Sequence, residues 1–375
     1  MQRKLTAAQA LMILNGLPHV GPVSVRRIRG CCGNDVRGLL SAAPSELLRM
    51  KGIGAKIADT LYNWHRYFDL NREESALKEK GAAFIPQNTA DYPVLLNEIY
   101  DPPLGLYWMG DYRIDRPCIA IVGSRRCTLY GQRTARQLAR DLASMGFCIV
   151  SGLARGIDSA AHEGAMEAKD GKTLAILGCG LDIIYPAENL HLYRHICSSG
   201  AIVSELPFGR RPDRQTFPMR NRIVSGMCVA TVVVETDRGG GSMITAHFAG
   251  EQGRTLFAVP GRIDQSSSRG CHQLIREGAI LFTTVEDILE ELHYLRSSPM
   301  IKDVVEAVRR PTLPDDLDEK ETRILSCFKG GEILTSDIVA ARAHLPPATV
   351  TSTLVMLELK KLIVKHVDGG FEARP

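Results

Sequence analysis

The chain has 375 residues, 45% hydrophobic and 23% charged, an ordinary composition for a soluble globular protein of two or three domains. It has no apolar run long enough to cross a bilayer and no signal-peptide pattern at its N-terminus. Its ten cysteines are scattered and include no Cys-x-x-Cys pair. We therefore expect a cytoplasmic protein with reduced thiols. The net charge is +4, but residues 1–80 hold 13 Lys and Arg against 7 Asp and Glu, which indicates either a phosphate-binding surface or a solvated helical face.

Residues 1–85 have the pattern of short helices punctuated by glycine, which predicts a helical domain, and this segment resembles domains of the helix-hairpin-helix or SAM-like kind. Residues 17–28 and 48–58 each end one helix, turn through glycine and open another. Such a turn aims backbone N–H groups at a phosphate, at the positive end of a helix dipole. The alternative is a plain packing turn in which glycine caps a helix. The candidates for auxiliary DNA binding are Lys51, Gly52, Gly54 and Lys56.

Residues 86–295 alternate apolar strand runs with helical stretches. Continuous apolar strands separated by helices predict a Rossmann-like, doubly wound and mostly parallel sheet with helices on both faces. The expected strands are 118–122, 147–150, 174–177, 201–203, 230–234 and 255–259, and the expected helices include 131–145 and 160–169.

Glycine, serine and arginine recur where these strands end. Gly123-Ser124-Arg125 follows the first strand, and residues 151–156, Ser-Gly-Leu-Ala-Arg-Gly, follow the second. In doubly wound sheets, ligands lie beyond the carboxyl ends of the strands, where helix N-termini offer N–H groups to anions. Glycine lets the backbone approach closely, and arginine presents a planar fork to phosphate. These motifs therefore indicate phosphate binding at that edge of the sheet.

The signatures of several enzyme classes are missing from the sequence. There is no P-loop, no Gly-x-Gly-x-x-Gly that opens a helix, no Gly-x-Ser-x-Gly elbow and no His-Glu-x-x-His motif. His162 follows Asp158 by one helical turn, a spacing that fits either a catalytic or metal pair or a local hydrogen bond or cap, and it is interpreted as the latter. Glu235, at a strand end, is either a catalytic carboxylate or a structural acceptor, and without an identifiable partner it is interpreted as an acceptor. We therefore expect a protein that is not an enzyme and that uses no cofactor and no metal.

An ordered series of motifs resembles the DNA-processing protein A (DprA/Smf) family over about residues 92–282. The series begins at Tyr92-Pro93, passes through the strand-end motifs and closes with residues 274–279, Leu-Ile-Arg-Glu-Gly-Ala. The resemblance implies a single-stranded-DNA-binding recombination mediator that protects incoming DNA and loads the RecA recombinase during natural transformation. It also implies a homodimer that forms through the core. The lack of a long apolar run predicts no membrane association.

The predicted DNA site is a cationic pocket where the strand ends converge, which would track a phosphate backbone. Phe217 either contacts a base or packs in the core, Asn221 either contacts DNA or caps a helix, and the glycines at 239–241 form either a phosphate nest or a flexible turn. The expected DNA-binding residues are Gly123, Ser124, Arg125, Ser151, Gly152, Arg155, Gly156, Phe217, Arg220, Asn221, Arg222, Gly240, Gly241, Ser242 and Thr245.

Two positions depart from the pattern of the family. Where the family usually has Arg-Ser-Gly-Ser, this chain has Arg238 followed by three glycines and Ser242, and His272 stands where the family usually has asparagine. Both departures affect the polar contacts expected of these two loops.

Paired prolines among polar residues predict a linker over residues 296–317, and residues 318–375 form a separate small unit. Helices over 319–328, 336–343 and 348–359, followed by a hairpin from residue 363, resemble a winged helix. Its third helix has little basic charge, so a protein contact and an auxiliary DNA contact are both open.

A nucleotide-processing enzyme of the lysine-decarboxylase-like phosphoribohydrolase type is the alternative function. Such enzymes share a Rossmann core and a glycine-rich loop that ends in threonine. Their loop carries a glutamate just after that threonine, whereas here Thr245 is followed by Ala246 and His247. Release of a base from nucleoside monophosphates would distinguish the two functions.

Overall fold

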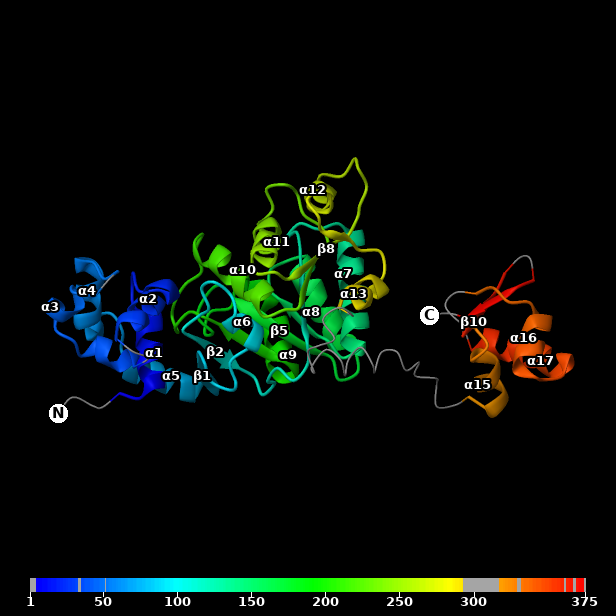
Figure 1. Cartoon of the computed structure of the whole chain (residues 1–375), viewed down its shortest axis with the longest axis horizontal. Coiled ribbons are helices and arrows are strands. Elements are labelled where there is room, and N and C mark those ends of the chain that lie inside the picture. Colours follow the sequence, from blue (N-terminus) through cyan, green and yellow to red (C-terminus); the bar gives the residue numbers. More distant parts are fainter. Residues whose placement is uncertain are drawn as a thin grey trace. The chain divides into compact units, whose positions relative to one another are not determined.

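Figure 1 shows the computed structural model of the chain, which describes residues 5–32, 35–50, 52–292, 317–328, 332–360, 362–366 and 369–373. The chain divides into two compact units, residues 1–307 and 308–375. Apart from Leu317, the expected linker over residues 296–317 lies outside the described residues, and so does the auxiliary site residue Lys51. No described helix combines the length and the apolar character that would let it span a membrane.

The framework of the first unit is a sheet in which the described residues form nine strands, in the order β1-β2-β6-β5-β4-β3-β7-β8-β9. Strands β3 to β9 pair only in parallel with one another, whereas β2 is antiparallel to both β1 and β6. This confirms the predicted Rossmann-like, mostly parallel sheet. The strands are β1 (Ala82–Pro86), β2 (Gly105–Met109), β3 (Cys118–Val122), β4 (Cys148–Ser151), β5 (Lys172–Leu177), β6 (Ala201–Ser204), β7 (Ala230–Val233), β8 (Thr255–Ala258) and β9 (Ile280–Leu281).

The six predicted strands match observed strands to within two residues at each end, but β1, β2 and β9 were not predicted. Strand β9 has two residues, too few to show a period, and β1 contains a proline and two alanines, which are poor strand formers. The domain boundary expected at residue 85 falls inside β1, so the sheet begins within the segment assigned to the helical domain.

Alternate residues of the strands pack against helices on opposite faces of the sheet. On one face, Ile119 and Ile121 pack in a core shared with α7 (Leu129–Ser144), α8 (Ile157–Glu167) and α13 (Val285–Leu292). On the other face, Ala120 and Val122 share a core with α10 (Thr216–Gly226), α11 (Gly241–Glu251) and α12 (Arg269–Arg276). The remaining helices of the sheet domain are α6 (Val94–Asn97) and α9 (Leu190–Ser199), with the 3-10 turns η3 (Ala187–Asn189) and η4 (Ser266–Ser268).

The N-terminal part of the first unit is a helical module that packs on the β1–β2 edge of the sheet. Thr6 and Gln9 form a capping box that starts its first helix. Both predicted hairpins are present, and Gly52 has a φ of +92°, which glycine adopts without strain. The elements of the module are α1 (Ala7–Gly16), α2 (Pro22–Cys32), η1 (Val36–Leu40), α3 (Pro44–Leu47), α4 (Ala55–Tyr62), η2 (Trp64–Arg66) and α5 (Leu70–Glu79).

The second unit is a winged helix, as expected. Three helices enclose a core that includes Val339, Val350 and Leu354, and a two-stranded hairpin closes it. The third helix exposes Val355 and Met356 and carries no basic residue within its bounds, which makes it a poor reader of the major groove. The elements are α15 (Glu319–Leu325), α16 (Ser336–Ala343), α17 (Pro347–Leu359), β10 (Ile363–Lys365) and β11 (Phe371–Ala373).

Candidate nucleic-acid interface

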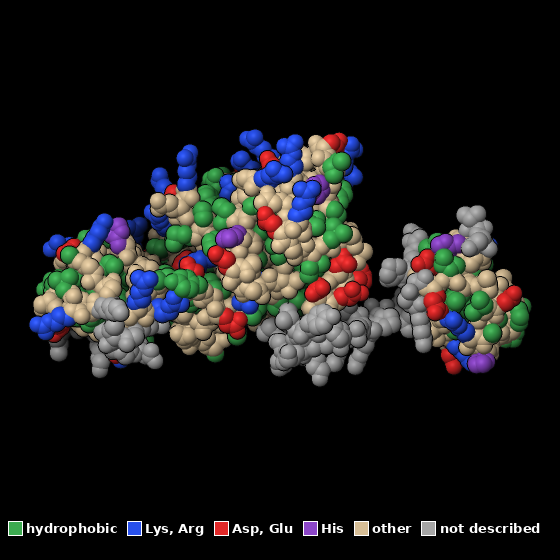
Figure 2. All heavy atoms as spheres, turned by 45° about the horizontal axis from the view of Figure 1, so that its top comes forward, with side chains coloured by type: hydrophobic (Ala, Val, Ile, Leu, Met, Phe, Trp, Pro, Cys, Tyr) green, Lys and Arg blue, Asp and Glu red, His purple; other side chains and the backbone are tan. Residues whose placement is uncertain are grey.

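Exposed arginines gather at the carboxyl edge of the parallel strands. Figure 2 shows blue side chains concentrated along the upper part of the core, where these loops and helix starts lie. Three of the arginines pair with neighbouring carboxylates, namely Arg155 with Glu188, Arg210 with Asp213 and Arg262 with Asp264. The exposed arginines at this edge are Arg125 and Arg126 after β3, Arg155 after β4, Arg210, Arg211 and Arg214 after β6, Arg238 after β7, and Arg262 and Arg269 after β8.

Arg125, Phe217 and Tyr185 meet at the centre of this edge. The guanidinium carbon of Arg125 lies 4.9 Å from the centroid of the Phe217 ring, and the ring of Tyr185 lies 5.5 Å from that of Phe217. Phe217 is half-buried and Tyr185 is 44% exposed, so neither ring belongs to the core. With Gly152 and Arg220 they line a hollow of about 30 Å³. This space is too small for a nucleobase.

Arg220 forms the charged floor of the hollow. Its guanidinium lies against the backbone of Gly152, and its Nη1 is 4.0 Å from the carboxylate of Asp158. That carboxylate also accepts the N–H groups of Gly152 and Ala154, at 3.1 and 3.3 Å. Burial lowers the pKa of Arg220 and raises that of Asp158. Because the ion pair is long and Nε of Arg220 has no hydrogen-bond partner among the described residues, the cation is incompletely compensated and suits an anion.

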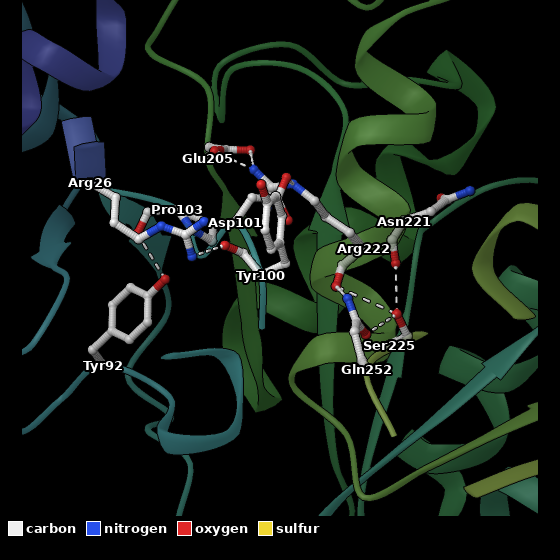
Figure 3. A network of polar contacts seen from close by, with 10 residues as sticks. All are labelled: Arg26, Tyr92, Tyr100, Asp101, Pro103, Glu205, Asn221, Arg222, Ser225 and Gln252. Atoms are coloured by element: carbon white, nitrogen blue, oxygen red, sulfur yellow. Dashed lines mark hydrogen bonds and ion pairs between the residues drawn. The ribbon is translucent and has the colours of Figure 1, made fainter. Parts of the chain in front are cut away.

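Arg222 does not belong to this hollow, and the expectation that it binds DNA is corrected. Its side chain is 3% exposed, and its Nη2 donates to the two carboxylate oxygens of Glu205 at 2.7 and 2.8 Å (Figure 3). Its Nε forms an ion pair with a carboxylate oxygen of Asp101 at 3.0 Å. Burial alone would lower the pKa of Arg222, but the two carboxylates outweigh it and raise the pKa. Two residues along a helix are about 200° apart, so Arg220 and Arg222 face opposite directions on α10. Arg222 therefore anchors α10 instead of reaching phosphate.

The glycine-rich loop leads into α11, whose N-terminus has no side-chain cap. The Ser242 hydroxyl in the first turn is buried and has no hydrogen-bond partner among the described residues. Nδ2 of Asn221 donates to the Gly241 carbonyl at 3.3 Å and ties this loop to α10. An open helix N-terminus beside an unpartnered hydroxyl is suited to binding an anion. The departure at His272 has its own partner, because Nε2 lies 2.9 Å from the Gly261 carbonyl.

Several predicted site residues shape the loops, and two of them do not reach the surface. Ser151 is fully buried and donates to the Ile121 carbonyl at 2.7 Å, and Thr245 is 2% exposed, so the expectation that these two contact DNA is corrected. Ser124 Oγ accepts the Arg126 N–H at 3.0 Å. Gly156, at φ +74°, approaches the Ser124 carbonyl so closely that a Cβ there would lie 2.4 Å from its oxygen. The loops after β3 and β4 thus support each other.

His162 and Glu235 have the structural roles that the sequence predicted. Nε2 of His162 faces the Leu153 N–H at 3.3 Å, which assigns the proton to Nδ1 and makes it a donor to Thr173 Oγ1 at 2.7 Å. Burial lowers the pKa of His162 to about 3. Glu235 accepts from the N–H and the hydroxyl of Thr128 at the start of α7, at 2.8 and 2.5 Å.

The second hairpin of the helical module also presents an uncapped helix N-terminus. Gly54 precedes α4 without a side-chain cap, and Lys56 in its first turn is exposed. In the first hairpin, Nη1 of Arg26 donates to the Tyr100 carbonyl at 2.5 Å, and its guanidinium carbon lies 4.6 Å from the centroid of the Tyr100 ring. Arg26 therefore helps to join the module to the sheet domain.

The structure adds residues that sequence reasoning missed. Tyr185 lies in the cluster, and the run from Arg210 to Arg214 was a local charge signal that the expected site left out. Large apolar side chains are also exposed on segments that follow the same strand ends. They are Leu129, Tyr130, Met219, Ile244 and Ile263.

The chain is similar to known proteins over most of its length. Residues 83–293 match the family model of DNA recombination-mediator protein A, and residues 308–369 match that of the DprA winged helix domain. Protein Smf of Synechocystis is 36% identical over 95% of this chain and 96% of its own length. The DNA processing protein DprA of Bacillus subtilis is 41% identical over 60% of this chain and 76% of its own.

Two solved structures resemble the chain. The X-ray structure of DNA processing protein A from Streptococcus pneumoniae covers 77% of this chain and 98% of its own, with a TM-score of 0.65 and 32% identity. The protein of that name from Helicobacter pylori, whose structure concerns its single-stranded DNA binding mode, covers 57% of this chain and 96% of its own, with a TM-score of 0.51 and 30% identity.

Proposed function

The chain belongs to the DNA recombination-mediator protein A family, and from this premise we propose that it binds single-stranded DNA at the carboxyl edge of its parallel sheet. The observation that carries the proposal is Arg125 stacked on Phe217 beside the exposed ring of Tyr185. Proteins hold single strands by combining a cationic track for the phosphates with side chains on which bases stack. This cluster supplies both within one small area.

Two positions are suited to phosphate. The first is the hollow between Arg125 and Arg220, where the buried guanidinium lacks full compensation. The second is the N-terminus of α11, where the glycine loop allows close approach of the backbone and the Ser242 hydroxyl lacks a partner among the described residues. Neither position needs a proton-transfer group, and the neighbouring carboxylates of Asp158 and Glu235 are engaged in holding loops. The site is therefore built for reversible binding without chemistry.

The bases would lie on the apolar side chains that separate the arginines. Phe217 and Tyr185 form the central platform, and Tyr130 and Met219 are exposed on α7 and α10, two helices that follow strand ends at the same edge. Stacking on such side chains is tolerant of sequence because every base has a π-face, and it is worth about 1–3 kcal/mol per base. A duplex keeps its bases stacked inside, so the platform favours single strands.

The helical module adds an auxiliary phosphate contact at the start of α4, with Gly54 and Lys56. Protection of incoming DNA and its transfer to the RecA recombinase during natural transformation are supported by family membership alone. Homodimerisation has one structural support: the module packs on β1 at one edge of the sheet, while β9 ends the sheet at the other and exposes 47% of Leu281.

A salt titration of binding to oligo-dT and to a duplex of equal length tests the proposal. We expect the single strand to bind more tightly, with log affinity falling linearly with log salt concentration. Preference for the duplex, or no binding to oligo-dT at low salt, would refute it. Incubation with nucleoside monophosphates tests the enzymatic alternative, which would be supported by release of the base.

A further inference from the structure

The loop between β6 and α10, residues 205–215, carries Arg210, Arg211 and Arg214 into the proposed DNA surface, and α10 follows with Phe217 and Arg220. Like charges on one loop repel, and ordering long exposed side chains costs conformational entropy. Fixed contacts elsewhere in the loop are therefore needed if its arginines are to be in place before DNA arrives.

Carboxylates from two distant segments hold two consecutive backbone N–H groups of this loop. The Phe208 N–H donates to Oε1 of Glu73 at 2.9 Å, and the Gly209 N–H donates to the carboxylate of Asp182 at 2.9 and 3.1 Å. Gly209 has a φ of +76°, a conformation that glycine adopts without strain. Asp182 belongs to the sheet domain, whereas Glu73 lies on α5 of the helical module. The helical module therefore holds the loop through this hydrogen bond.

The module holds the start of the same loop as well. Nδ2 of Asn15, on α1, donates to the Glu205 carbonyl at 2.5 Å. Glu73 is 6% exposed, and burial raises the pKa of its carboxyl while the Phe208 N–H opposes that rise. A buried carboxylate is costly unless hydrogen bonds compensate it, and an N–H bond to a charged acceptor is among the stronger ones. Both contacts join segments far apart in the sequence and converge on one loop.

We infer that Glu73 is a positioning residue for the DNA site. Through the Phe208 amide it fixes the arginine-bearing loop, and Asn15 fixes the loop at its first residue. The helical module thus raises DNA affinity through these two contacts, in addition to any phosphate contact of its own. This inference rests on the proposed binding of single-stranded DNA at the strand ends.

Simple electrostatics and the positioning role predict changes of opposite sign in DNA affinity when Glu73 is replaced by alanine. Removing an acidic group near a DNA surface should leave affinity unchanged or raise it. If Glu73 positions the loop, Glu73→Ala in the full chain should instead weaken oligo-dT binding by about tenfold, the cost of immobilising one or two long side chains. The salt slope, meaning the steepness with which log affinity falls as log salt concentration rises, should also decrease by about 0.7 for each phosphate that the loop no longer binds. A smaller folded fraction would lower the active concentration without changing that slope.

Matched variants separate this role from general damage. Glu73→Gln keeps an oxygen that accepts the Phe208 N–H, so it should restore affinity and slope. Glu79→Ala removes the same charge from an exposed position on the same helix and should leave both as in the wild type. Hydrogen exchange at the Phe208 and Gly209 amides should be faster in Glu73→Ala, with the strand amides unchanged. If Glu73→Ala does not fold, Asn15→Ala takes its place with the same expected fall in slope.

The outcomes separate this inference from the proposed function. A wild-type protein that does not bind oligo-dT refutes the function. A wild type that binds, together with a Glu73→Ala variant of equal affinity and slope, refutes only the positioning role. A Glu73→Gln variant as weak as Glu73→Ala would also overturn it, because the accepted N–H bond would then not be the cause.

Discussion

The guanidinium of Arg220 packs so closely on Gly152 that a Cβ at position 152 would stand 1.3 Å from Nη1. The absence of a side chain at the end of β4 is therefore what allows a buried cation from α10 to line the hollow between Arg125 and Tyr185. Gly152 and Arg220 are 68 positions apart in the sequence, and both line the hollow.

Gly152→Ala should displace Arg220 and weaken binding of oligo-dT by about tenfold or more, with a loss of stability of about 1–3 kcal/mol from overpacking. Fluorescence anisotropy with a labelled oligonucleotide measures the first effect, and urea unfolding the second. The control is Gly250→Ala, at an exposed helical position where an added Cβ meets nothing within 4 Å. Wild-type affinity in Gly152→Ala would show that Arg220 does not contribute to the site.

Arg125→Ala should weaken oligo-dT binding and lower the salt slope by about 0.7, the value for one phosphate contact on a single strand. The reason is that its guanidinium is exposed and fixed over Phe217. Affinities measured at several salt concentrations give the slope. Arg194→Ala, at an exposed position on α9, removes the same charge away from the strand ends and should change neither quantity. If both substitutions had equal effects, the loss in Arg125→Ala would reflect the overall charge of the protein and not a specific phosphate contact.

Arg222→Ala should destabilise the fold by about 3 kcal/mol and leave the salt slope of DNA binding unchanged. Removing this cation leaves the carboxylates of Glu205 and Asp101 without their partner, and breaking a buried ion pair costs about 3–5 kcal/mol. Urea unfolding measures the stability, and an anisotropy titration on the folded fraction measures the slope. A reduced salt slope with unchanged stability would show that Arg222 contacts DNA after all.

His162 should make the stability of the first unit fall with acid. Its folded-state pKa of about 3 lies below the ordinary value of 6.5, so below pH 6.5 the unfolded chain binds a proton that the folded chain excludes. The stabilisation is fully present above pH 6.5 and is lost as pH falls towards 3, at about 1.4 kcal/mol per pH unit.

Urea unfolding between pH 4.5 and pH 7.5 measures this dependence on His162. His162→Gln should flatten it, whereas His247→Gln, at a side chain that is 74% exposed, should leave it as in the wild type. An unchanged pH dependence in His162→Gln would mean that His162 is not the group that titrates.

Leu281→Arg should convert a homodimer into a monomer, because it places a charge on the exposed strand that ends the sheet. Light scattering at micromolar concentration gives the mass. In the wild type, affinity should rise with oligonucleotide length once two linked sites are spanned, and the variant should lose that gain while keeping its affinity for short oligonucleotides. A wild type that is already monomeric contradicts the dimer outright.

The sequence by itself determined the parallel core, its six central strands and the edge where the proposed ligand site lies. Those features follow from local patterns, since apolar runs of strand length alternate with helical periods, and every strand-end motif must then meet at one edge. The structural roles of His162 and Glu235 were also accessible, because the spacing of Asp158 and His162 is more typical of a local hydrogen bond and Glu235 has no catalytic partner in any local motif.

Only the tertiary structure decided which arginine of α10 faces the proposed site. Arg220 and Arg222 carry the same charge two positions apart, and no local pattern distinguishes them. The distinction comes from Asp101 and Glu205, which approach one side of α10 from distant parts of the chain, while Gly152 leaves room on the other. A long side chain turns towards whatever charge and space its neighbours provide, and those neighbours are brought together only by folding.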